Sequence, residues 1–223
     1  MLRITHIAVQ VPGLPELRLL REIGVLDNMP EVELTRIAGD QVTRTEVARA
    51  LRRSTDLMLW SGHGGPNQLA IPGDVVSGAW VATQLRAGAP RLAVFAACGS
   101  DVGDNLLRSV TLAVARRGIN AIGFPLRVDD AAAATYIVEL ARALIAGADV
   151  AVAHEVALEE IGGEDLAAAR GIELRGGLMN GYRELLDRMD GFDARLGRVE
   201  VVVDAVADHF GIKHGESESW KSH

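Results

Sequence analysis

The chain has 223 residues, a net charge of −7 at neutral pH and 48% hydrophobic residues. This length suits one sizeable domain with an appendage, and the composition is that of a globular protein. The acidic balance argues against a nucleic-acid partner. The single cysteine cannot form an internal disulfide, which favours a reducing, cytoplasmic location.

Neither a membrane segment nor a metal or cofactor site is predicted. The N-terminus lacks the long apolar stretch of a signal peptide. The most apolar stretch, 131–156, is interrupted by Glu139, Arg142 and Asp149, so it does not indicate a membrane span. The six histidines are scattered, and the cysteine has no Cys or His neighbour at ligand spacing.

Strands and helices are predicted to alternate through the first 160 residues. Apolar runs indicate strands, helical spacing of apolar residues indicates helices, and Thr43 with Glu46 forms a capping box. In chain order the expected elements are a strand over 2–11, a helix over 14–25, a strand over 31–37, a helix over 43–53, a strand over 56–61, a short hairpin piece over 68–71, a helix over 74–87, a strand over 92–97, a helix over 104–117, a strand over 119–124, and helices over 129–146 and 149–161.

This alternation is typical of an α/β protein with a doubly wound, mostly parallel sheet that helices cover on both faces. In such sheets ligands bind beyond the carboxyl ends of the strands. His63 follows the strand over 56–61, and Cys98 follows the strand over 92–97. If these strands are parallel neighbours, a thiol and a base lie one strand apart, which is the minimum equipment of a cysteine hydrolase.

The residues around His63 and Cys98 fit this chemistry. Glycine has no Cβ, so a substrate backbone can approach closely at Gly62, Gly64 and Gly65. The backbone amides of Gly64 and Cys98 are candidates for an oxyanion hole. Taken singly, Cys98 reads as a buried small hydrophobe and His63 as a turn histidine; taken together at two strand ends, they favour a dyad.

Three parts of the sequence resemble CHAT proteases, prokaryotic members of the caspase-like cysteine peptidase clan that also contains caspases, separases and gingipains. They are Thr43–Glu46 with Asp56–Gly64, then Ala89–Cys98, and then Gly118–Asp130. The similarity covers about residues 30–160, a typical length for a domain core. The resemblance implies a caspase-like three-layer sandwich over residues 1–170, with His63 as the base and Cys98 as the nucleophile.

The exit loop after the strand over 119–124 departs from the pattern of these relatives, because Phe124 stands where many of them carry Trp before Pro. Separase-like relatives place an acidic residue after this strand to hold a basic P1 side chain. Asp129 and Asp130 are the candidates here, and Asp101 is a further candidate for substrate binding. The alternative is that these residues cap the helices that follow them.

The last third of the chain predicts a helical, coiled-coil-like segment over 176–211. Its apolar residues step by four and three: Leu178, Tyr182, Leu185, Met189, Phe192, Leu196, Val199, Val203, Val206 and Phe210. This seam predicts a homodimer or a regulatory partner bound through 178–210. Two intramolecular helices broken at Asp190–Gly191 are the alternative. The polar end, 213–223, is expected to be disordered.

The function predicted from these features is that of a cytoplasmic cysteine endopeptidase that cuts a specific protein substrate. Relatives of this kind act in bacterial defence and stress systems. The alternative is a caspase-like scaffold without activity that works through its C-terminal coil. A nucleotide-binding protein that uses Ser61–Gly65 as a phosphate loop is a third reading, which lacks the Lys-Ser/Thr pair of a P-loop.

Overall fold

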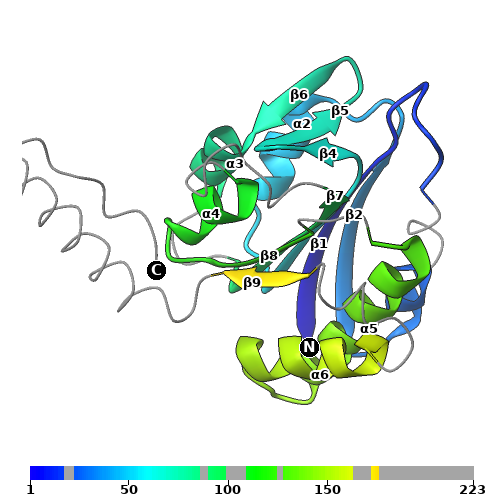
Figure 1. The fold of residues 1–223 in the computed structure, drawn as a ribbon, viewed down its shortest axis with the longest axis vertical. Helices are drawn as coiled ribbons and strands as arrows, with labels where there is room; N and C mark the ends of the chain where they lie inside the picture. Colours follow the sequence, from blue (N-terminus) through cyan, green and yellow to red (C-terminus); the bar gives the residue numbers. More distant parts are fainter. Residues whose placement is uncertain (18–22, 86–89, 99–108, 125–127, 163–171, 176–223) are drawn as a thin grey trace, which may run out of the picture. The chain divides into compact units, whose positions relative to one another are not determined.

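The central sheet of the molecule has six strands in the order β2-β1-β3-β7-β8-β9 (Figure 1). The first five strands are parallel, and β9 is antiparallel to β8. The computed structural model describes residues 1–17, 23–85, 90–98, 109–124, 128–162 and 172–175. The strands are β1 Leu2–Val9, β2 Val32–Gly39, β3 Leu57–Ser61, β7 Leu92–Cys98, β8 Asn120–Phe124 and β9 Glu173–Arg175.

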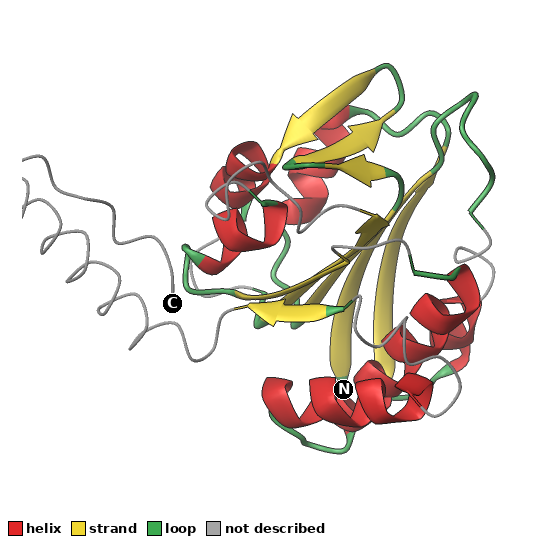
Figure 2. Ribbon diagram, viewed as in Figure 1, coloured by secondary structure: helices red, strands yellow, loops and turns green. Residues whose placement is uncertain are grey.

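Helices cover both faces of this sheet, which gives three layers (Figure 2). Strands buried on both faces carry apolar residues at every position, and in β3 all five residues are buried. Leu57 and Leu59 belong to one core, which includes residues of the 3-10 helix η1 (Ile23–Asn28), α5 (Asp130–Ile145) and α6 (Val150–Gly162). Met58 and Trp60 belong to the other core, which includes residues of α2 (Arg44–Leu51), α3 (Gly78–Gln84) and α4 (Val110–Ala115).

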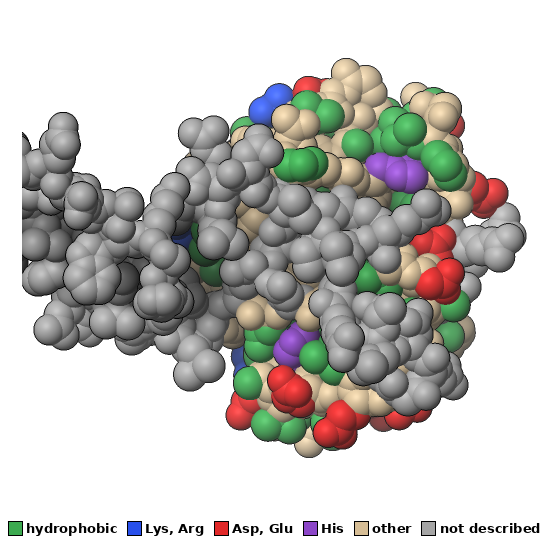
Figure 3. All heavy atoms as spheres, viewed as in Figure 1, with side chains coloured by type: hydrophobic (Ala, Val, Ile, Leu, Met, Phe, Trp, Pro, Cys, Tyr) green, Lys and Arg blue, Asp and Glu red, His purple; other side chains and the backbone are tan. Residues whose placement is uncertain are grey.

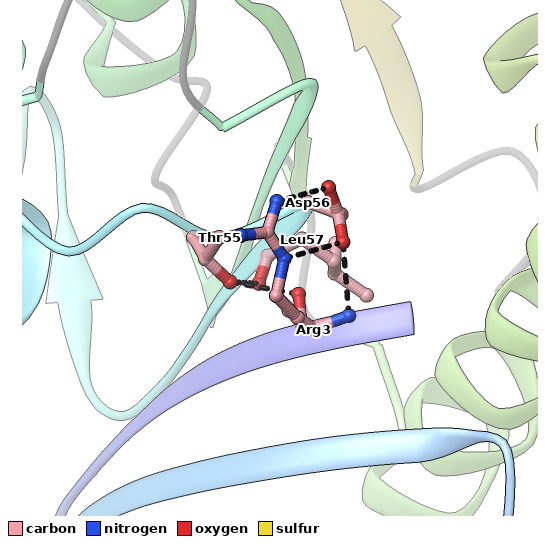
Figure 4. A network of polar contacts seen from close by, with 4 residues as sticks. All are labelled: Arg3, Thr55, Asp56 and Leu57. Carbon is pink, nitrogen blue, oxygen red and sulfur yellow. Dashed lines mark hydrogen bonds and ion pairs between the residues drawn. The ribbon is translucent and has the colours of Figure 1, made fainter. Parts of the chain in front are cut away.

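A polar network joins the beginnings of β1 and β3 (Figure 4). The guanidinium of Arg3 donates to both carboxylate oxygens of Asp56, at 3.2 and 3.0 Å, and the Arg3 backbone amide donates to the same carboxylate at 3.0 Å. Thr55 Oγ1 lies 2.7 Å from the Arg3 carbonyl oxygen. These contacts fix the β1–β3 register at the amino ends of the strands, so the residues that follow their carboxyl ends are also in fixed positions.

A second, three-stranded sheet follows β3 directly. It contains β4 (Gly64–Gly65), β5 (Gln68–Ile71) and β6 (Asp74–Ser77), all antiparallel. The turn between β5 and β6 contains Gly73 with a φ of 72°, a left-handed conformation that glycine adopts without strain. The loop that carries His63 therefore runs from the main sheet straight into a hairpin.

Most of the predicted elements are confirmed. The five predicted strands of the main sheet and the hairpin piece over 68–71 are present, as are the helices within 43–53, 129–146 and 149–161. The capping box of Thr43 and Glu46 closes in both directions. In the helix predicted over 104–117, the structure shows Val110–Ala115, capped by Ser109; residues 104–108 lie outside the described part.

Two predicted helices are wrong in part. The helix predicted over 74–87 begins only at Gly78, because β-branched Val75 and Val76 pair with β5 and Ser77 caps α3. The helix predicted over 14–25 is not formed at residues 14–17, which have no helical structure, and the segment Ile23–Asn28 is a 3-10 helix. The strand β9, which pairs antiparallel with β8 at the edge of the sheet, was not predicted from the sequence.

The chain divides into two units, Met1–Asn180 and Gly181–His223, and every described residue belongs to the first. The coiled-coil-like segment predicted over 176–211 and the tail predicted over 213–223 lie outside the described residues. Acidic side chains gather at the lower edge of the face in Figure 3. Glu155, Glu159 and Glu160 of α6 are exposed. Among the described helices, none has the length and apolar character needed to cross a membrane.

Candidate active site

The two strands that lead to His63 and Cys98 are parallel neighbours. Their register runs from Leu57 opposite Leu92 to Ser61 opposite Ala96. His63 comes two residues after Ser61, and Cys98 comes two residues after Ala96. Both residues therefore stand at the same edge of the sheet, each two residues after the last β3–β7 pair; Cys98 is the last residue of β7, and His63 lies in the loop after β3. The predicted adjacency of the two strands is confirmed.

Cys98 also has a defined position relative to β8. Phe95 pairs with Gly123 and Cys98 pairs with Phe124, so β7 holds two more residues than β8 between these pairs. Such irregularities often re-aim a strand next to a functional site. The Cys98 side chain and the predicted substrate-binding residue Asp101, within 99–108, lie outside the described residues.

The imidazole of His63 contacts the loop that follows β1. Its Nε2 atom lies 3.0 Å from the Pro15 carbonyl oxygen. A carbonyl oxygen can only accept a hydrogen bond, so Nε2 carries the proton, and in the neutral ring Nδ1 carries the lone pair. Nδ1 is therefore the nitrogen that can take a proton from a thiol. The side chain is half-buried.

The backbone around His63 is tied to both sheets. The Gly62 amide donates to the Ala96 carbonyl of β7 at 3.3 Å, and the Ala70 amide of β5 donates to the His63 carbonyl at 2.9 Å. Gly64, the predicted oxyanion donor, begins β4 and pairs with Leu69. Its role as an oxyanion donor stays a prediction, as does that of the Cys98 amide.

The packing of the Trp60 side chain leaves too little room for a side chain at Gly62. A Cβ atom at Gly62 would lie 2.9 Å from Trp60 Nε1 and 3.4 Å from the Val9 carbonyl oxygen. The indole is fully buried, and its Nε1 has no hydrogen-bond partner among the described residues. The glycine before His63 thus serves the packing of the indole, in addition to any role in substrate approach.

A series of hydrogen-bonded polar side chains lies near the carboxyl ends of β1 and β3. It was not predicted from the sequence. His6 of β1 is fully buried. Its Nε2 lies 2.9 Å from Ser61 Oγ, and its Nδ1 accepts from Arg36 Nε at 3.1 Å. Arg36 in turn pairs with Asp27 at 2.7 Å. Burial, together with the charge of Arg36, lowers the pKa of His6 to about 3, so the imidazole is neutral.

Phe124, which pairs with Cys98 across β7 and β8, packs against an aromatic side chain of the core. The Phe124 ring packs edge-on against Tyr136 of α5, with 6.2 Å between ring centroids. Tyr136 Oη lies 2.6 Å from Nδ1 of His154 on α6, and both residues are buried. Burial raises the pKa of Tyr136 and lowers that of His154, so both groups are neutral. Phe124, the residue that departs from the resemblance, is therefore packed into the core.

Asp129 caps α5. Its Oδ1 accepts from the Ala131 amide at 2.9 Å, and its own backbone is extended. The capping alternative considered for Asp129 or Asp130 is thus confirmed for Asp129. Asp130 lies in the first turn of α5. Substrate binding by either residue stays a prediction.

Within the described ranges, no group of three or more His, Cys, Asp or Glu residues is arranged to hold a metal ion. No protein-family model matches the chain, and no curated protein matches its sequence.

Proposed function

We propose that this chain is a cysteine endopeptidase of the caspase-like, CHAT type, with His63 as the base and Cys98 as the nucleophile. The observation that carries the proposal is the parallel pairing of β3 with β7. Neighbouring strands of a sheet lie about 4.8 Å apart. Parallel neighbours bring the residues at their carboxyl ends to the same edge of the sheet. This supports a thiol and an imidazole close enough to exchange a proton.

The hydrogen bond from His63 to the Pro15 carbonyl supports the same roles, because it leaves Nδ1 to act as the base. In the proposed reaction, Nδ1 takes the Cys98 thiol proton, and Sγ attacks the carbonyl carbon of the scissile peptide bond. The tetrahedral intermediate collapses as the imidazolium gives its proton to the leaving amine, and a thioester forms. Water then loses a proton to Nδ1 and attacks the thioester; the carboxylic acid leaves, and the thiol regains its proton.

The architecture is compatible with this proposal. A mostly parallel sheet between two helical layers presents its strand ends as a rigid platform for side chains. The resemblance of Asp56–Gly64 and Ala89–Cys98 to CHAT proteases covers the two strands that lead to the dyad. These two strands are the ones that pair.

Specificity and regulation form the finer part of the proposal. The substrate is a specific protein cut after a basic or uncharged P1 residue, and Asp130 is the carboxylate proposed to favour a basic one, since Asp129 is used as a helix cap. Activity is controlled by assembly, either as a homodimer or with a regulatory protein, through residues 178–210. The cellular setting is bacterial defence or stress signalling in the cytoplasm.

A survey of cleavage sites tests the proposal. The native chain, Cys98→Ala and His63→Ala are each incubated with a complex protein mixture, and new N-termini are sequenced. The proposal predicts cuts with the native chain that both variants lose while their circular dichroism spectra stay native. Cuts that persist in Cys98→Ala would refute the assignment of the nucleophile.

The same native chain and variants distinguish the rival proposal, a scaffold without activity. It predicts no cuts that depend on Cys98, and a Cys98 thiol in the native chain that resists iodoacetamide. A reactive thiol that becomes inert in His63→Ala would argue against the scaffold even before a substrate is known.

A further inference from the structure

The side chain of Gln10 bonds to four residues of the loop after β1. Its Nε2 lies 3.4 Å from the Val11 carbonyl oxygen, 3.4 Å from that of Leu14 and 3.3 Å from that of Pro15. Its Oε1 accepts from the Leu17 amide at 3.3 Å. An amide group has two N–H donors, so the three carbonyls share them. Gln10 thus spans the whole loop from within.

The Pro15 carbonyl oxygen receives two hydrogen bonds, one from Gln10 Nε2 at 3.3 Å and one from His63 Nε2 at 3.0 Å. The ring of a proline fixes φ but leaves ψ variable, and ψ sets the direction of the carbonyl group. The bond of Gln10 to the Leu14 carbonyl, before this torsion, and its bonds to the Pro15 carbonyl and the Leu17 amide, after it, restrict ψ. The direction in which the oxygen meets the imidazole therefore depends on the Gln10 side chain.

We infer that Gln10 is a positioning residue for His63, which acts through the Pro15 carbonyl. This inference rests on the proposed function, because the tautomer and orientation of the His63 imidazole affect catalysis only if His63 is the base. Gln10 touches neither the substrate nor the reacting atoms. It holds the Pro15 carbonyl in place, and this carbonyl keeps the His63 proton on Nε2. The lone pair of Nδ1 is then available to take the proton of Cys98.

Removal of the Gln10 amide leaves the Pro15 carbonyl with the His63 bond alone. The loop then samples other ψ values, the His63 bond becomes intermittent, and the imidazole distributes its proton over both nitrogens. Displacement of a catalytic group by about 1 Å can cost about a hundredfold in rate. We expect kcat to fall between about tenfold and a hundredfold with little change in KM, because substrate contacts are unaffected.

The test compares three variants of the full chain. Gln10→Met removes the donors and the acceptor at similar length, whereas Gln10→Lys keeps a donor that reaches the carbonyls. Gln84→Met is the matched control, since it removes a glutamine that bonds Arg52 and Thr83, far along the chain from the loop. Long-range ¹H–¹⁵N spectra report the tautomer of His63, assigned by the signal lost in His63→Ala. Thermal melts confirm folding, and Gln10→Glu replaces Gln10→Met should the latter not fold.

The native chain and Gln84→Met are expected to hold the Nε2–H tautomer of His63, and Gln10→Met is expected to show a mixture of tautomers. Gln10→Lys should lie between them. The kcat values should follow, highest in the native chain and Gln84→Met and lowest in Gln10→Met. If the native chain shows Cys98-dependent cleavage, but Gln10→Met has an unchanged tautomer and an unchanged kcat, the role of Gln10 is overturned and the proposed function is upheld. A tautomer mixture in Gln10→Met, with no Cys98-dependent cleavage by the native chain, would overturn the proposed function and support the link between Gln10 and His63.

Discussion

His6 Nε2 lies 2.9 Å from Ser61 Oγ, which joins a fully buried imidazole on β1 to the last residue of the strand before His63. Arg36 Nε donates to the other ring nitrogen. The imidazole can accept this bond only while it is neutral, and protonation would place a second cation beside Arg36. The neutral state of His6 is therefore a condition of this packing.

This condition predicts a loss of stability in acid. The pKa of His6 is about 3 in the folded chain against an ordinary value of 6.5. Between these values the unfolded chain binds a proton that the folded chain does not, so the free energy of unfolding falls as the pH falls from about 6.5 to about 3, by up to about 1.4 kcal/mol per pH unit. Denaturant unfolding at a series of pH values measures the slope.

His6→Gln isolates this contribution, because Asp56 and other carboxylates also lose stabilising contacts in acid. The variant is expected to be less stable near pH 7 and to have a flatter dependence on pH below 6.5. Equal slopes for His6→Gln and the native chain would show that the His6 imidazole is not held neutral by the fold.

Gly62→Ala is expected to destabilise the chain by about 1–3 kcal/mol through overpacking against the Trp60 indole. Gly65→Ala is the matched control, since a Cβ atom there meets nothing within 4 Å. Because the Trp60 Nε1 atom is the closest neighbour, Trp60→Phe should restore part of the loss. Chemical denaturation of the single and double variants gives the coupling, and independent effects of Gly62→Ala and Trp60→Phe would contradict the contact.

Tyr136→Phe is expected to lower the free energy of unfolding by about 1–3 kcal/mol, because it leaves the buried Nδ1 of His154 without its hydrogen-bond partner. The double variant Tyr136→Phe, His154→Leu removes both polar groups and should lose less than the sum of the single changes. Thermal and denaturant unfolding measure both. Additive losses would mean that the two side chains do not bond to each other.

Asp129→Ala is expected to cost about 0.5–2 kcal/mol as the loss of an N-cap, and Asp129→Ser should retain most of that stability. If capping is its whole role, the P1 residues of the cleavage sites stay the same in Asp129→Ser. A loss of cuts after basic residues in this stably folded variant would instead assign Asp129 to substrate binding.

The strands of the main sheet could be predicted from sequence because parallel strands buried on both faces read as unbroken apolar runs. The adjacency of β3 and β7 was a condition of the proposed dyad and does not follow from the apolar runs. The helix predicted over 74–87 was wrong in its first turn, since the pairing of Val75 and Val76 with β5 is a tertiary interaction that overrides helical spacing. The short β9 has no periodic signal at all.

The candidate site was predictable only in part. His63 and Cys98 stand next to glycines at strand ends, and this local signal marked them. The series of polar side chains from Asp27 to Ser61 depends on which strands become neighbours and in which register, so no local pattern reveals it. A histidine inside the apolar run of β1 was the one visible trace. The Gln10 bonds likewise depend on the path of a loop with two prolines.

The rate at which iodoacetamide modifies Cys98 tests the His63–Cys98 dyad most directly, since it needs no substrate. The thiolate is the reactive form, and an imidazole within reach increases its share near neutral pH. Intact-mass measurements at pH 7 should show about tenfold faster modification in the native chain than in His63→Ala, with both chains folded. Equal rates in the two chains would contradict the dyad.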